Sequence, residues 1–235
     1  MGRLDTSGVS GERAIMPVPL QIGLGAWITG VILAAFLWVP PAAGFAAPEA
    51  ARIVVFHVPC AMVAVVAYLV STAYAIAYLA RRSASSDAKS AASAGLGFLF
   101  TVLATVTGMV FAQVQWGSAW NWDPRETSIL MLMIVYAAYF ALRGAIPGSV
   151  ARARISASYN VLACLVMPYL VFVMPRLMGG LHPTGTLSGP GALSTEYRVV
   201  LACAMLGFVW LYVWMLRIQV RLAECEAARG RKKSV

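Results

Sequence analysis

The chain has 235 residues, of which 60% are hydrophobic and only 11% are charged, and its mean hydropathy is +0.77. Charged residues make up about a quarter of an ordinary soluble domain, so this composition excludes that class and indicates an integral membrane protein. The net charge of +9 would point to nucleic acid in a soluble chain. Here the basic residues cluster between apolar runs, as membrane topology requires, so we expect a lipid bilayer and no nucleic acid as partner.

Four cysteines are present, and their spacing carries no redox or haem-attachment motif. There is no CxxC pair and no CxxCH sequence, which excludes a thiol relay of that type and a c-type cytochrome. Three of the four lie in apolar runs, where a cysteine behaves as a small buried hydrophobic residue. The positions are Cys60, Cys164, Cys203 and Cys225.

Six apolar stretches are long enough to cross a bilayer, which needs about 20 residues per helix. No internal repeat and no second domain is evident, so we expect residues 1–235 to form one all-α integral membrane domain with six transmembrane helices. The stretches are 19–39, 53–80, 91–114, 125–143, 159–178 and 197–219.

The distribution of Lys and Arg predicts the orientation, because cytoplasmic loops carry an excess of them. Fourteen of the 18 lie in the termini and in or directly before the short connectors 83–90 and 144–158, which places both termini in the cytoplasm. Loops 40–52, 115–124 and 179–196 then face outward. From Arg217 the chain continues as a basic, helical tail suited either to anionic lipid or to a cytoplasmic partner.

Residues 116–127, WGSAWNWDPRET, interrupt the apolar pattern within the outward loop 115–124. A single Trp there would be explained by the aromatic belt of membrane proteins. Trp116, Trp120 and Trp122 are instead separated by small and polar residues, which leaves room for a flat ligand. Trp116 and Trp120 are four residues apart, so we expect them to share one face of a short surface helix that forms an aromatic platform.

The only two histidines, His57 and His182, both fall on the predicted outer side, and the tryptophan-rich loop lies between them in sequence. A zinc site needs three or four protein ligands, and Cys60 is the one nearby candidate for a third. Haem needs only two axial ligands from the protein, because the porphyrin supplies the other four donors. Two histidines and an aromatic wall satisfy that requirement completely.

The charged end of the loop divides into two functions. Asp123 as N-cap, Pro124 at the first helical position and Glu126 two residues later predict the start of the fourth helix. Arg125 has no part in that cap, and an Arg at the outer interface is suited to a bidentate contact with a carboxylate such as a haem propionate. Weaker candidates for this contact are Arg52, Arg176 and Arg198.

Two further features predict helix packing. Small residues at three- and four-residue spacing in the third stretch form a face that lets a neighbouring helix approach closely. These residues are Gly97, Thr101, Ala104, Gly108 and Ala112. Pro168 lies inside the fifth stretch and is expected to kink it.

The segment WGSAWNWDPRETS resembles the tryptophan-rich WWD motif of haem-handling membrane proteins of cytochrome c biogenesis. FHVPCA at 56–61 and LHPT at 181–184 are similar to one branch, cytochrome c maturation protein C, also called haem exporter protein C. The resemblance covers essentially the whole chain. One difference is that WDPRET is closer to the WDPKET form of the larger haem lyases of the second biogenesis system.

The resemblance implies haem b, held non-covalently at the periplasmic face of the bacterial inner membrane. His57 and His182 would be the axial ligands, with Trp116, Trp120, Trp122, Asp123 and Arg125 around the porphyrin. Haem would then pass to a periplasmic haem chaperone, with ABC transporter subunits and a small single-span accessory subunit as further partners. Such a chain is a haem-binding and transfer component with no catalytic residue of its own.

Two other functions remain open at this point. A haem lyase would act directly on apocytochrome c thiols, but that class usually has more spans and more histidines. A quinone-linked membrane cytochrome would need histidines within the spans at a spacing suited to electron transfer across the bilayer. The depth and number of histidines distinguish the three.

Overall fold

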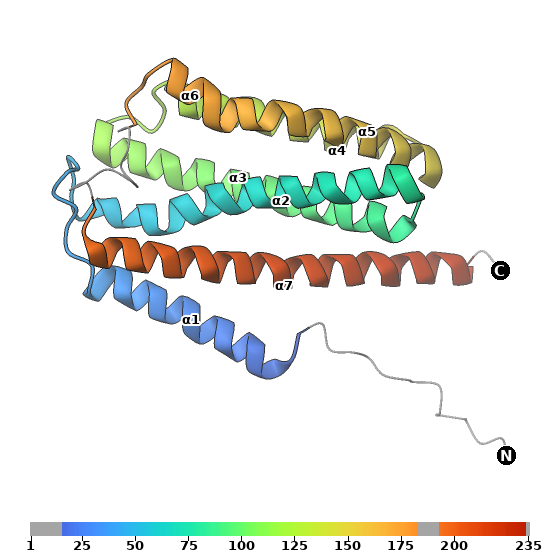
Figure 1. Cartoon of the computed structure of the whole chain (residues 1–235), viewed down its shortest axis with the longest axis horizontal. Coiled ribbons are helices and arrows are strands. Elements are labelled where there is room, and N and C mark those ends of the chain that lie inside the picture. The colour runs from blue at the N-terminus through green and yellow to red at the C-terminus, as the bar shows by residue number, and fades with distance from the viewer. Residues whose placement is uncertain (1–15, 183–192, 234–235) are drawn as a thin grey trace.

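The computed structural model describes residues 16–182 and 193–233, and within these ranges every regular element is helical (Figure 1). Six helical segments are long and apolar enough to cross a membrane, which confirms the predicted spans. The elements are α1 (Val18–Leu37), η1 (Ala50–Ile53), α2 (Val54–Arg81), α3 (Ala84–Trp116), α4 (Pro124–Ala145), α5 (Ser149–Pro168), η2 (Tyr169–Val173), α6 (Met174–Leu177) and α7 (Thr195–Lys233).

The connectors at one end of the bundle are shorter than the sequence predicted. Most of 83–90 forms the first turns of α3, and α5 already begins at Ser149, so the expected connectors 83–90 and 144–158 are wrong in length. Arg82 and Gly148 make the tight turns with positive φ of 54° and 86°. The tail from Arg217 is helical as predicted, because α7 runs without interruption to Lys233.

The segments expected to face outward gather at one end of the bundle. The chain between α1 and α2, the loop between α3 and α4, the end of α6 and the start of α7 all lie at the left of Figure 1. The turns between α2 and α3 and between α4 and α5 lie at the other end. This alternation agrees with the predicted topology. The assignment of the second end to the cytoplasm remains a prediction from Lys and Arg.

The small-residue face of α3 packs against α2, as predicted. A Cβ on Gly97 would lie 2.7 Å from the ring of Tyr68, so only glycine allows this approach. The hydroxyls of Tyr68 and Thr101 are 2.9 Å apart, and the ring of Tyr68 stacks on Tyr136 of α4 with centroids 3.6 Å apart. These contacts join α2, α3 and α4 below the candidate site.

Buried polar side chains tie the helices together farther from the site. Asn160 of α5 donates from Nδ2 to the hydroxyl of Ser71 at 2.6 Å and to that of Ser90 at 3.2 Å. Arg143 makes a bidentate contact with Asp87, with N···O distances of 2.8 and 2.7 Å. Polar groups in a membrane interior must find protein partners, and these pairs fix the relative positions of α2, α3, α4 and α5.

The fifth span changes helix type where the proline was expected to disturb it. α5 ends at Pro168, η2 follows as a π-helical turn, and α6 completes the span. Proline has no N–H for the carbonyl four residues earlier, and a π turn is one way in which a helix adjusts to that loss. η2 and α6 supply Leu170, Val171 and Pro175 to the candidate site.

Candidate functional site

One cavity of about 170 Å³ at the loop-bearing end contains both histidines of the chain. Its walls come from α2, α3, α4, η2, α6 and the tryptophan-rich loop, and they include His57, Trp120, Arg125 and His182. Most of the remaining lining is apolar. Closed pockets for small molecules occupy about 300–1,000 Å³, so a ligand as large as a porphyrin would project from this cavity rather than be enclosed by it.

His57 lies in the first turn of α2 and is oriented by α3. Its Nδ1 is 3.1 Å from the hydroxyl oxygen of Thr107. That hydroxyl donates its single proton to the backbone oxygen of Leu103 at 2.7 Å, so its oxygen accepts from Nδ1–H of His57. This tautomer leaves the lone pair on Nε2, the atom that a metal ion would bind.

Gly108 makes room for the imidazole of His57. A Cβ at this position would lie 3.0 Å from Cε1 of the ring. The sequence placed Gly108 on the small-residue face of α3 and assigned it to helix packing. Its open side in fact faces the histidine, so this glycine is needed for the position of the imidazole of His57.

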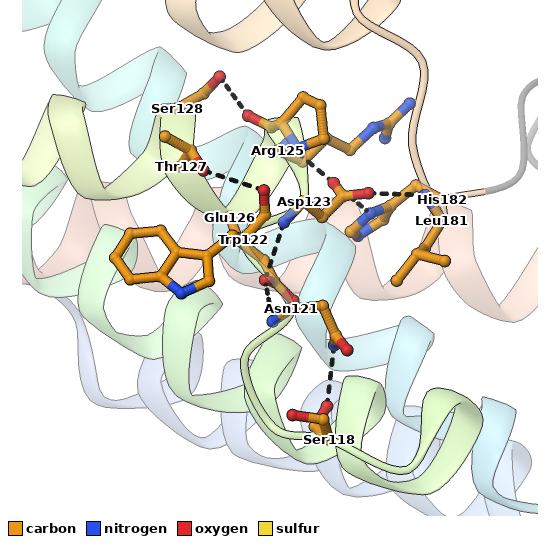
Figure 2. A network of polar contacts seen from close by, with 11 residues as sticks. Ser118, Asn121, Trp122, Asp123, Arg125, Glu126, Thr127, Ser128, Leu181 and His182 are labelled. Atoms are coloured by element: carbon orange, nitrogen blue, oxygen red, sulfur yellow. Dashed lines mark hydrogen bonds and ion pairs between the residues drawn. The ribbon is translucent and has the colours of Figure 1, made fainter.

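His182 is oriented by the N-cap of α4, as Figure 2 shows. Its Nδ1 is 3.0 Å from Oδ1 of Asp123, and the backbone N–H of Leu181 donates to Oδ2 of the same carboxylate at 2.7 Å. A carboxylate only accepts, so Nδ1 of His182 carries the proton and Nε2 again keeps its lone pair. Among the described residues, neither histidine has a hydrogen bond to Nε2.

Gly180 allows the chain after α6 to come this close to Asp123. A Cβ on Gly180 would lie 2.3 Å from Oδ2, a distance that real Cβ atoms do not adopt. The ring of Trp116 packs against the other side of His182, with centroids 4.9 Å apart and an interplanar angle of 70°. His182 is therefore held by a carboxylate and by an aromatic edge contact.

The carboxylate of Asp123 is ionised, and the imidazole of His182 is neutral at pH 7. Burial acts to raise the pKa of Asp123, but hydrogen bonds from the N–H groups of Arg125 and Leu181 and from His182 lower it below its usual value. Burial lowers the pKa of His182, and the charge of Asp123 offsets this only in part. A neutral imidazole that donates to a carboxylate is the form found in many metal-binding histidines.

The predicted cap of α4 is confirmed. Asp123 accepts from the backbone of Arg125 at 2.9 Å, and the carboxylate of Glu126 accepts from the backbone N–H groups of Asn121 and Asp123, which completes a capping box. Asp123 thus serves both the helix and the histidine. The sequence indicated the first function from the DPRE pattern but gave no sign of the contact with His182.

The predicted short surface helix is wrong. α3 ends at Trp116, Gly117 caps it with φ of 81°, and residues 118–123 are not helical. Ser118 donates to the backbone of Trp120, and Asn121 donates back to Ser118, so local hydrogen bonds hold the loop in an irregular path. Trp116 and Trp120 therefore do not share a helix face.

The three tryptophans have three different surroundings. Trp116 packs on His182, and Trp120 lines the cavity. Trp122 is 70% exposed, has a positive φ of 55° and contacts Trp120 edge-on with centroids 5.8 Å apart. Figure 2 shows its indole on the opposite side of the loop from His182. The predicted contact of Trp122 with a ligand stays a prediction.

Arg125 is the arginine that lines the cavity. No hydrogen bond joins its guanidinium to another described residue. Arg52 instead pairs with Glu49 and donates to the backbone of Val39, and Arg176 donates to the backbone of Phe172. Arg198 lies in the first turn of α7 and does not line the cavity.

The alternative zinc site lacks a third protein ligand among the described residues that line the cavity. Cys60 is buried among the helices and does not line the cavity. Within the described parts of the chain, no group of three or more His, Cys, Asp or Glu side chains is arranged to hold a metal ion. The site supplies two imidazoles in one cavity, which suits a metal whose other donors come from the ligand itself.

Comparison with known proteins gives the family. The family model for heme exporter protein C matches residues 9–234. The chain belongs to the heme exporter protein C family. Relatives named heme exporter protein C include one from Paracoccus denitrificans. It is 30% identical over 216 residues, which cover 88% of this chain and 86% of the relative. One from Rhodobacter capsulatus is 31% identical over 193 residues, 79% and 77% of the two chains.

A weaker similarity, over less than half of the chain, is to another kind of cytochrome c biogenesis protein. The cytochrome c biogenesis protein CcsA of Panax ginseng is 37% identical over 94 residues, which cover 40% of this chain and 28% of that protein. Membership in the heme exporter protein C family together with six apolar helices makes this chain a multi-pass membrane protein of haem handling in cytochrome c biogenesis. It thus acts with other components of cytochrome c maturation.

Proposed function

We propose that this chain binds haem b non-covalently at the periplasmic face of the bacterial inner membrane and presents it to a periplasmic haem chaperone. One observation carries the proposal: His57 and His182 share one cavity, each has Nδ1 fixed by a hydrogen bond, and Nε2 of each has no hydrogen bond to another described residue. Haem supplies four equatorial nitrogen donors of its own, so two axial imidazoles complete its coordination.

The surrounding residues would position the two ligands and the porphyrin. Asp123 holds the tautomer of His182 and makes its Nε2 a stronger donor, as carboxylates next to metal-bound histidines do. Trp120 offers its indole as a wall for the ring. Arg125 lines the cavity, its guanidinium has no hydrogen bond to another described residue, and it would bind a propionate.

The outer end of the bundle would be the place of transfer, since the haem would project from a cavity this small. We infer that the chaperone meets the protein at this end, and that ABC transporter subunits and a small single-span subunit are the other partners. The chain carries out no covalent step in this proposal. Its residues bind, orient and release haem.

A haem lyase that acts directly on apocytochrome c is the second candidate. It is favoured by the 37% identity to the CcsA protein and by the WDPRET sequence. Against it, the chain matches only 28% of that relative. A lyase would have to place the cysteine thiols of apocytochrome c next to the haem vinyl groups.

A transfer experiment separates the two candidates. The purified protein is loaded with isotope-labelled haem and mixed either with the apo-chaperone or with apocytochrome c, and label in each acceptor is followed by mass spectrometry. We expect label in the chaperone and none covalently bound to apocytochrome c. Covalent label in apocytochrome c without the chaperone would instead establish the lyase, and label in neither acceptor would overturn both candidates.

A further inference from the structure

A second cavity, of about 450 Å³, lies between α2, α3 and α7 at the end of the bundle opposite the histidines. Three of its lining side chains are cationic and one is a carboxylate: Lys89, Arg217, Arg221 and Glu224. A cavity with such an excess of positive charge is suited to an anionic group. Nothing in the haem site uses these residues.

The depth of this cavity matches the headgroup region of the inner leaflet. At about 1.5 Å per residue, Arg217 lies about 33 Å along α7 from Thr195, and Tyr74 lies about 30 Å along α2 from Val54. The hydrocarbon core of a bilayer is about 30 Å thick. With the first residues of α2 and α7 at the outer interface, the cavity opens where lipid phosphates are found. The Lys and Arg distribution predicts that this is the cytoplasmic side.

The side chains combine charge with an apolar wall. Lys89 is half-buried, and its Nζ sits 5.5 Å from the ring centroid of Tyr74, which holds the ammonium at the cavity edge. Val213, Leu216 and Val220 of α7 form the apolar part of the lining. A free phosphate ion would gain nothing from these aliphatic residues, whereas a lipid would place its acyl chains against them.

We propose that this cavity binds the phosphate headgroup of an anionic phospholipid of the cytoplasmic leaflet. Lys89 and Arg217 contact the phosphate, and the lipid's acyl chains lie along the aliphatic side chains of α7. Basic cavities between transmembrane helices on the cytoplasmic side bind acidic lipids by the same combination of forces. The bound lipid would join α7 to the α2–α3 pair at this end of the bundle.

Native mass spectrometry tests the proposal on the full chain. The protein is exchanged into nanodiscs of equal parts phosphatidylglycerol and phosphatidylcholine, released into detergent, and the retained lipids are counted. Wild-type protein is expected to keep phosphatidylglycerol in preference to phosphatidylcholine. Each basic group near an anionic headgroup contributes about 1 kcal/mol, so Lys89→Gln with Arg217→Gln should lower this preference roughly tenfold or more.

The matched control is Arg152→Gln with Arg154→Gln, which removes two exposed charges from the same end of the bundle but outside the cavity. It should keep the wild-type lipid preference. An equal loss in both double variants, or no loss in either, overturns the proposal. Excess inorganic phosphate should leave the lipid bound, and its release by phosphate would assign the cavity to free phosphate instead. The visible spectrum of added haem, which reports the far end of the bundle, checks that each variant is folded.

Discussion

The two histidines sit in one cavity but are held by different means. His57 belongs to α2, donates from Nδ1 to the neutral hydroxyl of Thr107 and fits against Gly108 of the neighbouring helix. His182 follows the short α6 and is held by the ionised carboxylate of Asp123, which belongs to a loop 59 residues away in sequence. One histidine is thus fixed by the helix bundle, and the other by the tryptophan-rich loop.

Because of this difference, the helix bundle and the tryptophan-rich loop contribute differently to the site. A charged acceptor makes an imidazole a better metal ligand than a neutral acceptor does, so the loop supplies the stronger donor. The helix pair α2–α3 supplies the position of the other histidine. If the protein binds and then releases haem as proposed, loss of the Asp123 contact would weaken the His182 side alone, because His57 does not contact that carboxylate.

The largest difference in haem binding is expected when the hydrogen-bond acceptor of His182 is changed and the result is compared with a change of the acceptor of His57. Asp123→Asn removes the charge but keeps a capping side chain, and Thr107→Val removes the hydroxyl at nearly constant shape. We expect Asp123→Asn to weaken haem binding by roughly 10- to 100-fold, as for other outer partners of metal-bound histidines, and Thr107→Val to weaken it less. Titration of the purified variants with haem measures both. Equal losses of haem affinity in the two variants would contradict the distinction between His57 and His182.

The next largest effect on haem binding is expected from the glycines that lie close to each histidine site. Gly180→Ala places a methyl 2.3 Å from the carboxylate of Asp123, and Gly108→Ala places one 3.0 Å from the His57 ring. Both should weaken haem binding, and Gly180→Ala more, because the closer contact cannot be relieved without moving the carboxylate. Gly25→Ala is the control, since nothing lies within 4 Å of its Cβ. If Gly180→Ala binds haem as well as Gly25→Ala does, the carboxylate contact has no importance for the site.

The tryptophans test whether the loop acts only through His182. Trp120→Ala should weaken haem binding by several-fold, because loss of one aromatic contact with a ligand costs about 0.5–1.5 kcal/mol. Trp122→Ala should have a smaller effect, because its indole is exposed, does not line the cavity and lies across the loop from His182. The dissociation rate of haem, followed by transfer to excess apomyoglobin, measures both. A faster rate in Trp122→Ala than in Trp120→Ala would reverse this assignment.

The smallest expected effect is that of pH on haem retention. The pKa of His182 is lowered from 6.5 by burial, so its Nε2 stays free of a proton as the pH falls from 8 to 6.5, and Asp123 stays ionised throughout. Haem retention should therefore be constant in this window and fall only below it, when protons compete for Nε2. Retention on a gel-filtration column at stepped pH values checks this. Loss that begins above pH 6.5 would mean that His182 is not the buried neutral ligand described.

Much of this architecture followed from the sequence for simple reasons. The six spans came from hydropathy, which depends only on local composition, and the cap at Asp123 came from a local pattern. The sequence placed His57 and His182 on the same side of the membrane because an even number of spans separates them. These predictions need no knowledge of which helix touches which.

The remainder depends on contacts between distant segments. The bond from His182 to Asp123 forms only because Gly179 and Gly180 turn the chain back onto the start of α4. The loop was expected to be helical because Trp116 and Trp120 have the right spacing, but Gly117 ends the helix and Asn121 stabilises a different path. Thr107 was unremarkable in the sequence, since a threonine within a span usually bonds its own helix.

The axial assignment is tested most directly by ligand replacement. Haem is added to purified wild-type protein, His57→Gly and His182→Gly, and visible spectra are recorded with and without imidazole in the buffer. We predict a six-coordinate, low-spin spectrum for wild type, its loss in each variant, and its recovery in both when imidazole fills the vacated position. A variant whose spectrum matches wild type without added imidazole would contradict the central claim that these two histidines bind the iron.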